Sequence, residues 1–141
     1  MKEQGISRLS DILQLQLMKA TYCEKVDECV RDVDQAAVGL SELFTEDVRV
    51  DYGMGPLQGR DAVVKFLVSA IGATNDALWH SIHTPRIDVT GDTAVGQWTL
   101  LAKMKRKGST RFETLFGRYQ DDFRRTAQGW RISSVRFTRE G

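Results

Sequence analysis

The sequence has few of the residues that build covalent or metal-bound frameworks. Only two cysteines and two histidines occur among its 141 residues. Cys23 and Cys29 lie six residues apart on one predicted helix, so they point in different directions and favour free buried thiols over a disulfide or a metal pair. Long apolar runs are also missing, because none approaches the roughly 20 residues that a membrane-spanning helix needs. We therefore expect no disulfide and no membrane partner.

A large net charge is absent as well. The formal net charge is +1, which is too close to neutral to indicate a nucleic-acid partner. From Ala102 onward the chain holds 11 Lys and Arg against 4 Asp and Glu, and Lys103–Arg111 is strongly basic. That segment lacks interleaved aromatic residues and fits a solvated hairpin tip, so we expect no nucleic-acid binding. The glycines of Gly53–Pro56 are not followed by the Gly-Lys-Ser/Thr of a phosphate loop.

The composition is that of an ordinary soluble domain. Hydrophobic residues make up 41% of the chain and charged residues 28%. The length fits one domain, residues 1–141, and no repeat, linker or low-complexity tract divides it. Residues 1–5 lack the apolar core of a secretory signal, so we expect a cytoplasmic protein.

The first half of the chain predicts three helices. The first is capped near Ser7 or Ser10 and runs to about Val30, the second begins near Asp34, and the third spans residues 60–71. The first helix carries an apolar stripe, which is typical of a face that packs on a core, with further apolar residues beside it. The stripe holds Leu9, Ile12, Leu13, Leu17 and Ala20, and its neighbours are Leu15, Met18, Tyr22 and Val26.

Strands dominate the rest of the chain. Residues 47–53 alternate between apolar and polar side chains, and residues 53–59 fit a turn with a short return strand. Helices followed by a run of antiparallel strands favour an α+β domain. A curved sheet with helices packed on one face would leave a pocket between them, where small molecules bind. The later predicted strands are residues 79–89, 93–105, 112–123 and 130–139.

Asp27 stands out on the first helix. It shares a face with Ala20, Cys23 and Val30, and a carboxylate that faces a core needs a hydrogen-bond donor. The two histidines of Trp79–His83 are the candidate partners with functional chemistry. A surface position, or a structural hydrogen bond to a loop amide, is the alternative for this carboxylate.

Several short motifs with consistent spacing spread across nearly the whole chain. Together with the order of elements, they resemble the SnoaL-like family of the nuclear-transport-factor-like superfamily. The resemblance implies a cone-shaped α+β fold, in which a curved, mixed, mainly antiparallel sheet wraps around three helices and encloses a central pocket. The motifs are Tyr22 with Asp27, Leu43–Val48, Asp51–Gly53, Gly59–Asp61, His80–Ile87, Gly91–Ala94 and Gly129–Ile132.

Within this family the chain resembles most the branch of scytalone dehydratase, the bacterial bile-acid dehydratase and hexachlorocyclohexane dehydrochlorinase. The resemblance implies a catalytic pair of Asp27 and His80, in which the carboxylate orients the imidazole. It also implies that Tyr22 and Tyr52 are catalytic hydroxyl donors. By residue type, such an arrangement suits proton transfer at carbon without a cofactor.

His80 and His83 lie three residues apart, so in a regular strand they point to opposite faces. The resemblance selects His80 for the pocket and leaves His83 as a structural or substrate-binding residue at the rim. A bulge near Pro85 would make His83 the substitute. Because no third metal ligand accompanies this spacing, we expect no metal site.

Further residues are candidates for the substrate-binding wall. An arginine of the bile-acid enzyme falls on Arg139, whereas a second acidic residue of that enzyme falls on Ala102. This departure from the family pattern puts the substrate and the proton relay of that enzyme in doubt for this chain. Ordinary core packing is the alternative for each remaining candidate. These are Met54, Phe66, Trp79 and Trp98.

The pattern favours a cofactor-independent lyase of the dehydratase type. Its expected substrate is a small, hydrophobic, oxygenated and cyclic molecule. An isomerase or a polyketide-type cyclase would use the same pocket. The rival is a non-catalytic ligand-binding or oligomerisation module, which predicts a pocket filled by side chains such as Trp98 and Phe116. The resemblance also implies a homo-oligomer, either a dimer or a trimer, joined through the outer face of the sheet.

Overall fold

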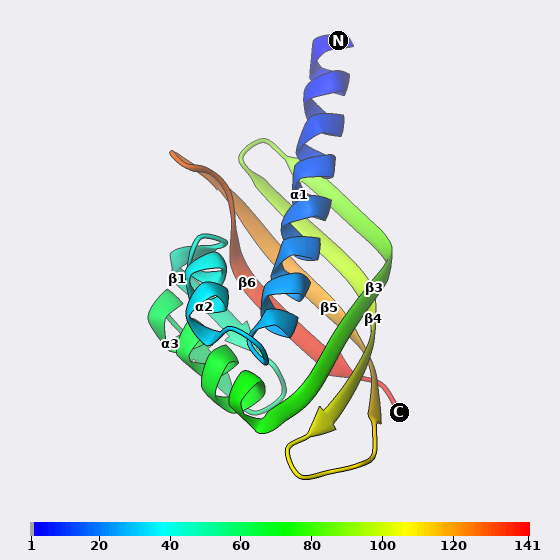
Figure 1. Cartoon of the computed structure of the whole chain (residues 1–141). Helices are drawn as coiled ribbons and strands as arrows, with labels where there is room; N and C mark the ends of the chain where they lie inside the picture. The colour runs from blue at the N-terminus through cyan, green and yellow to red at the C-terminus, as the bar shows by residue number, and fades with distance from the viewer. Residues whose placement is uncertain (1) are drawn as a thin grey trace.

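A six-stranded, curved sheet forms the frame of the protein, which a computed structural model describes from residue 2 to residue 141 (Figure 1). The strand order is β2-β1-β6-β5-β4-β3, and only β1 and β6 run parallel. The expected curved, mixed and mainly antiparallel sheet is confirmed. Its strands are β1 Phe44–Asp51, β2 Pro56–Gln58, β3 Asn75–Thr90, β4 Thr93–Arg106, β5 Glu113–Thr126 and β6 Gly129–Arg139.

Three helices lie against one side of this sheet. Figure 1 shows α1 crossing the concave side, with α2 and α3 packed beside its C-terminal end. The expected third helix is a regular α-helix only to Phe66. It continues as a wider π-helical turn, Leu67–Ile71, and ends in a tighter 3₁₀ turn, Gly72–Thr74. The helices are α1 Lys2–Glu28, α2 Val33–Ser41 and α3 Arg60–Phe66.

Several predicted boundaries shift. The helix expected from Ser7 or Ser10 begins by Lys2, and β1 covers Phe44–Asp51 rather than residues 47–53. β3 starts at Asn75, four residues before its expected start, because its pairing with β4 continues to the end of that strand. Met1, where the expected domain begins, lies outside the described residues.

The bend of β3 is centred just beyond the two histidines. The register between β3 and β4 shifts between His83 and Arg86, and Thr84 adopts a φ of 51°. A left-handed residue in a strand marks a bulge, which increases local twist. Figure 1 shows β3 turning here, so that its first half runs alongside α1.

The apolar stripe predicted to pack on the core lies largely outside. Leu9, Leu13 and Leu17 are exposed, so that part of the prediction is wrong. Charged residues on the opposite face of α1 form hydrogen bonds and an ion pair with residues of the sheet. Because of these partners, the opposite face can be buried although it carries charges. The buried residues of α1 are Asp11, Leu15, Lys19, Tyr22, Cys23 and Val26.

The main core fills the space between the helices and the sheet. Trp98 on β4 is buried there, with its ring edge against Phe123 of β5. Gly96 leaves room for the Trp98 ring, because an added Cβ would lie within 2.6 Å of it. Among residues 2–141, no helix is both long and apolar enough to cross a membrane.

Candidate functional site

A cavity of about 440 Å³ opens between the C-terminal half of α1 and the concave side of the sheet. Its volume lies in the range that proteins use to enclose small molecules. Most of its lining residues are aliphatic or aromatic, so the cavity suits a largely apolar ligand. Apolar lining residues include Val26, Leu67, Ile71, Leu78, Leu100, Met104, Leu115 and Phe137.

His80 of β3 faces this cavity and is held by Asp27 in the last turns of α1. Asp27 Oδ1 lies 2.7 Å from His80 Nδ1, while Oδ2 accepts the backbone N–H of the same residue at 3.0 Å. The two contacts fix both the ring and the strand against the carboxylate. The structure brings Asp27 to His80, and not to His83.

The same contacts set the proton arrangement of the imidazole. A carboxylate accepts hydrogen bonds, so it favours the tautomer with the proton on Nδ1 of His80. In the neutral ring, Nε2 then carries a lone pair. The side chain is only 9% exposed, and that of Asp27 only 16%, which shields the pair from bulk water. This arrangement can take a proton from a molecule in the cavity.

Asp27 also sits where a helix does not favour a carboxylate. The last carbonyl groups of a helix carry partial negative charge, and Glu28 adds a further acid. The contacts from the side chain and backbone of His80 offset this unfavourable position. At this position near the C-terminus of α1, the Asp27 carboxylate is therefore stabilised by its two contacts with His80.

A pair of tyrosine hydroxyls contributes a second polar group to the cavity. Tyr22 of α1 and Tyr52 of the β1–β2 connection line it, and their hydroxyl oxygens lie 2.6 Å apart. Burial raises the pKa of both phenols above the ordinary value, so both stay protonated. Two hydroxyls that share one hydrogen bond retain one proton that can be donated to a ligand oxygen.

A third phenol, that of Tyr119 on β5, also lines the cavity, and the sequence analysis missed it. Its ring stands edge-on to Tyr22 with the centroids 5.9 Å apart. Burial raises its pKa well above the ordinary value. Alternation along β5 places Tyr119 on the same face as the buried Phe123, and this was the available signal.

Behind these rings lies a buried ion pair that sequence reasoning also missed. Lys19 Nζ is 2.8 Å from Asp121 Oδ2, and both side chains are completely buried. The ammonium lies 3.6 Å from the ring centroid of Tyr119 and 4.0 Å from that of Tyr22. Burial raises the pKa of the Asp121 carboxyl, and the charge of Lys19 opposes that rise.

Charged and flexible residues surround the opening of the cavity. Arg106 and Glu113 pair across β4 and β5 at 2.9 Å, and both line the cavity. Arg139, a predicted substrate-binding residue, lines the cavity too, and Met54 lies at its exposed edge. Because Glu113 offsets the charge of Arg106, Arg139 is the residue that offers positive charge to an anionic or oxygenated ligand here.

Four of the predicted substrate-binding residues do not line the cavity: Phe66, Trp79, His83 and Trp98. Phe66 stacks on Tyr52 from behind, with centroids 5.7 Å apart. Trp79 is 56% exposed and stacks on Phe112, because its neighbour His80 occupies the inward position of the strand.

His83 is exposed and does not line the cavity. Trp98 belongs to the core beneath the middle of α1, and Phe116 is exposed. The cavity is therefore not filled by the two side chains that the non-catalytic alternative named. Within residues 2–141, no group of three or more His, Cys, Asp or Glu side chains is arranged to hold a metal ion.

With this geometry established, comparison with known proteins identifies the family. Residues 7–136 match the SnoaL-like domain. The chain belongs to this family. A relative, the uncharacterized protein Rv2910c of Mycobacterium tuberculosis, is 30% identical over 130 residues, covering 91% of this chain and 84% of its own length.

Solved structures share the fold of the SnoaL-like chain. A proposed scytalone dehydratase from Novosphingobium aromaticivorans is 22% identical, with a TM-score of 0.82 over 100% of this chain and 89% of the other. The hexachlorocyclohexane dehydrochlorinase LinA-type3 from Novosphingobium barchaimii is 14% identical, with a TM-score of 0.84 over 97% and 91%. At these identities the likeness establishes the fold alone.

Proposed function

We propose that this SnoaL-like protein is a cofactor-independent lyase that removes water from a small, hydrophobic, cyclic β-hydroxy carbonyl compound. The observation that carries the proposal is the Asp27–His80 pair at the wall of an apolar cavity. Support comes from two proteins that share the fold and are named as a proposed dehydratase and a dehydrochlorinase, names that both denote elimination reactions.

The first step is proton abstraction. Nε2 of His80 takes a proton from the carbon next to the carbonyl group, and Asp27 stabilises the resulting imidazolium. The free proton of the Tyr22–Tyr52 pair donates a hydrogen bond to the carbonyl oxygen, where negative charge develops. Because burial raises the pKa of both phenols, the tyrosines stabilise this enolate without transferring their protons.

The second step expels the hydroxyl group. The imidazolium of His80 returns its proton to the hydroxyl oxygen, the carbon–oxygen bond breaks, and water leaves. The electron pair of the enolate forms the new carbon–carbon double bond, so the enzyme ends in its starting state. General acid–base assistance of this kind contributes about 10²–10⁴-fold to rate.

The test is a turnover assay with cyclic β-hydroxy ketones, monitored by mass spectrometry for loss of water. We expect His80→Ala and Asp27→Asn each to lower kcat/KM by about 10²–10⁴-fold. His83→Ala is the matched control, since this histidine is exposed and does not line the cavity. It should keep full activity.

Other outcomes decide between the alternatives. A product of unchanged mass that depends on His80 would make the protein an isomerase or a cyclase. Ligand binding that survives His80→Ala, without turnover by the unmodified protein, would identify a binding module and refute the proposed lyase.

A further inference from the structure

The outward face of α1 carries an apolar stripe that its own fold leaves uncovered. Ile6, Leu9, Leu13 and Leu17 are 62–67% exposed. They line a shallow groove of about 410 Å³ along the helix, together with the uncharged Ser10 and Gln14. Four large aliphatic residues in one row form a contiguous exposed patch, which marks an interaction surface.

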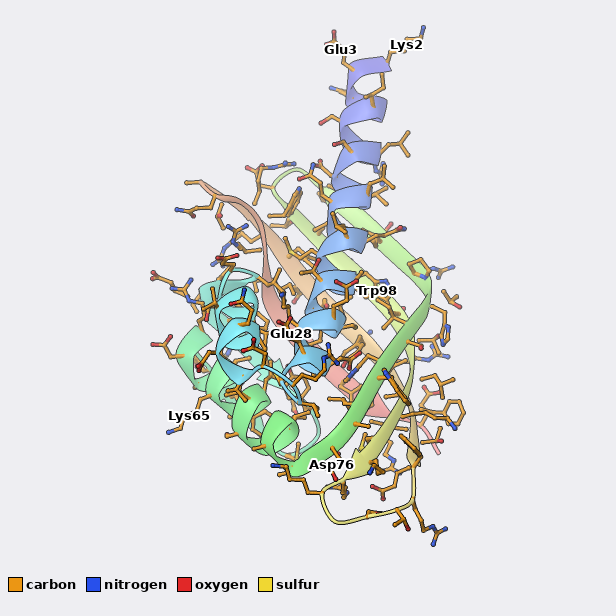
Figure 2. The ribbon with its side chains drawn as sticks, viewed as in Figure 1. Lys2, Glu3, Glu28, Lys65, Asp76 and Trp98 are labelled. Atoms are coloured by element: carbon orange, nitrogen blue, oxygen red, sulfur yellow. The ribbon has the colours of Figure 1, made fainter. Side chains whose placement is uncertain are left out.

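This stripe lies on a part of the helix that the sheet does not enclose. Figure 1 shows the N-terminal end of α1 projecting beyond the strands, and Figure 2 shows Lys2 and Glu3 at that end, away from the rest of the molecule. The opposite face of α1 is anchored by Asp11 and Lys19 to the sheet. The helix is therefore fixed in orientation and presents the stripe outward.

The positions on this face form a palindrome about Leu13. Successive residues of this face, from Lys2 to Glu24, are 4, 3, 4, 4, 3 and 4 positions apart, so the spacing is the same when counted from either end. A palindromic helix face is complementary to its own copy in antiparallel orientation, which is the requirement for an isologous two-fold interface. The series is Lys2, Ile6, Leu9, Leu13, Leu17, Ala20 and Glu24.

The charges at the ends of the series agree with that symmetry. When Leu13 faces itself across a two-fold axis, Leu9 lies opposite Leu17 and Ile6 opposite Ala20. Lys2 then lies opposite Glu24, and both are exposed. One pair of opposite charges therefore closes each end of the row. Parallel pairing would instead place each charge beside its own copy.

The spacing also fits two nearly straight helices. An 11-residue period over three turns corresponds to about 3.67 residues per turn, close to the 3.6 of an α-helix. The row from Lys2 to Glu24 spans about 33 Å at 1.5 Å per residue. Side chains can therefore stay in register over the whole row without strong supercoiling.

We propose that the stripe on α1 binds a second copy of this chain, forming an antiparallel helix pair with Leu13 on the two-fold axis. This interface is separate from the outer sheet face that the family resemblance implied. It buries the four exposed aliphatic residues of each copy.

The test uses the full chain and sedimentation equilibrium over a range of concentrations. Leu13→Glu places two carboxylates together on the axis, so we expect dimer affinity to fall by at least about 100-fold. Val95→Glu changes the outer face of the sheet, the rival interface that the family resemblance implied, at a half-exposed residue. It should leave the affinity of the helix pair unchanged. Circular dichroism of each variant verifies folding.

Cysteine substitution tests the register. Under mild oxidation Leu13→Cys should crosslink to its own copy, whereas Leu17→Cys alone should not. A mixture of Leu9→Cys and Leu17→Cys should crosslink. Native Cys23 and Cys29 are buried and contribute little background.

Four results would overturn the proposal. They are a monomer at all concentrations, a dimer lost in Val95→Glu but kept in Leu13→Glu, crosslinking of Leu17→Cys alone, and cosedimentation of a monomeric chain with anionic phosphatidylserine vesicles that Leu13→Glu abolishes. The last result would assign the stripe to a lipid surface.

Discussion

Two polar side-chain pairs join α1 to the sheet, and their members on α1, Lys19 and Asp27, lie eight residues apart. Their surroundings differ sharply. Lys19 and Asp121 meet at 2.8 Å with both side chains fully buried. Asp27 and His80 meet at 2.7 Å, with 16% and 9% of their side chains exposed. The contact lengths are almost equal, so distance does not distinguish the two pairs.

Access to the cavity separates them. The ammonium of Lys19 is closed in by Asp121 and by the rings of Tyr22 and Tyr119, so it has no route to a ligand. The ring of His80 is held on one side only and lines the cavity with the other. We infer that the first pair serves the fold and that the second is free to do chemistry.

The largest expected effect is on the fully buried pair. Lys19→Ala leaves Asp121 without its cation in a dry site, so we expect the free energy of unfolding to fall by about 3–5 kcal/mol. Urea denaturation measures this loss. A change below about 1 kcal/mol would mean that water reaches Asp121 and that the comparison fails.

A double variant provides the control for this loss. Lys19→Met combined with Asp121→Leu removes both charges and keeps apolar volume, so its stability should lie near that of the unmodified protein or above it. That outcome would attribute the loss in Lys19→Ala to an unpaired charge rather than to a cavity.

The second-largest expected effect on stability is at Asp11, which lies eight residues before Lys19 in α1. Asp11 accepts hydrogen bonds from both terminal nitrogens of Arg125, at 3.1 and 2.9 Å, and from Trp130 Nε1 at 3.0 Å. The hydrogen bonds from Arg125, and then that from Trp130, lower the pKa of the Asp11 carboxyl. We expect Asp11→Asn to cost about 1.5–3 kcal/mol at pH 7.

The pH dependence of this loss follows from the lowered pKa. A lowered carboxyl pKa in the folded state contributes stability above the unfolded value of about 3.9, and that stability is lost as the pH falls through the folded value. Urea midpoints measured between pH 7 and pH 2 should therefore converge for Asp11→Asn and the unmodified protein. A constant difference would show that Asp11 acts by packing alone.

The smallest expected change in stability is at the cavity. Asp27→Asn keeps an oxygen that accepts a hydrogen bond from His80, so the free energy of unfolding should change by only about 1 kcal/mol. Thermal melting measures it, while turnover should fall far more. A loss as large as that of Lys19→Ala would make Asp27 a structural anchor and remove the contrast between the pairs.

The order of the elements was readable because local patterns encode it. Alternation along residues 93–105 reports which side of β4 is buried, and the sequence shows it without any partner strand. The faces of α1 were not readable in this way. A row with Leu9, Leu13 and Leu17 predicts a core face, yet the buried row includes Asp11 and Lys19.

The physical reason is that the partners of these charges are remote in sequence. Asp11 depends on Arg125, and Lys19 on Asp121, each more than one hundred residues away. Without these partners, burying either charge would be costly, so local pattern favours the wrong face. The family resemblance identified Asp27 and His80, but it did not identify Arg125 and Asp121 as the partners of the buried charges on α1.

The sequence by itself determined the class of the fold, because the periods of helix and strand are local properties of the chain. It also supplied Asp27 and His80 as chemical types suited to moving a proton. Only the tertiary structure decided which charges meet a cavity and which are enclosed by aromatic rings. Burial, ion pairing and access to solvent depend on residues brought together from distant parts of the chain, and no local pattern records them.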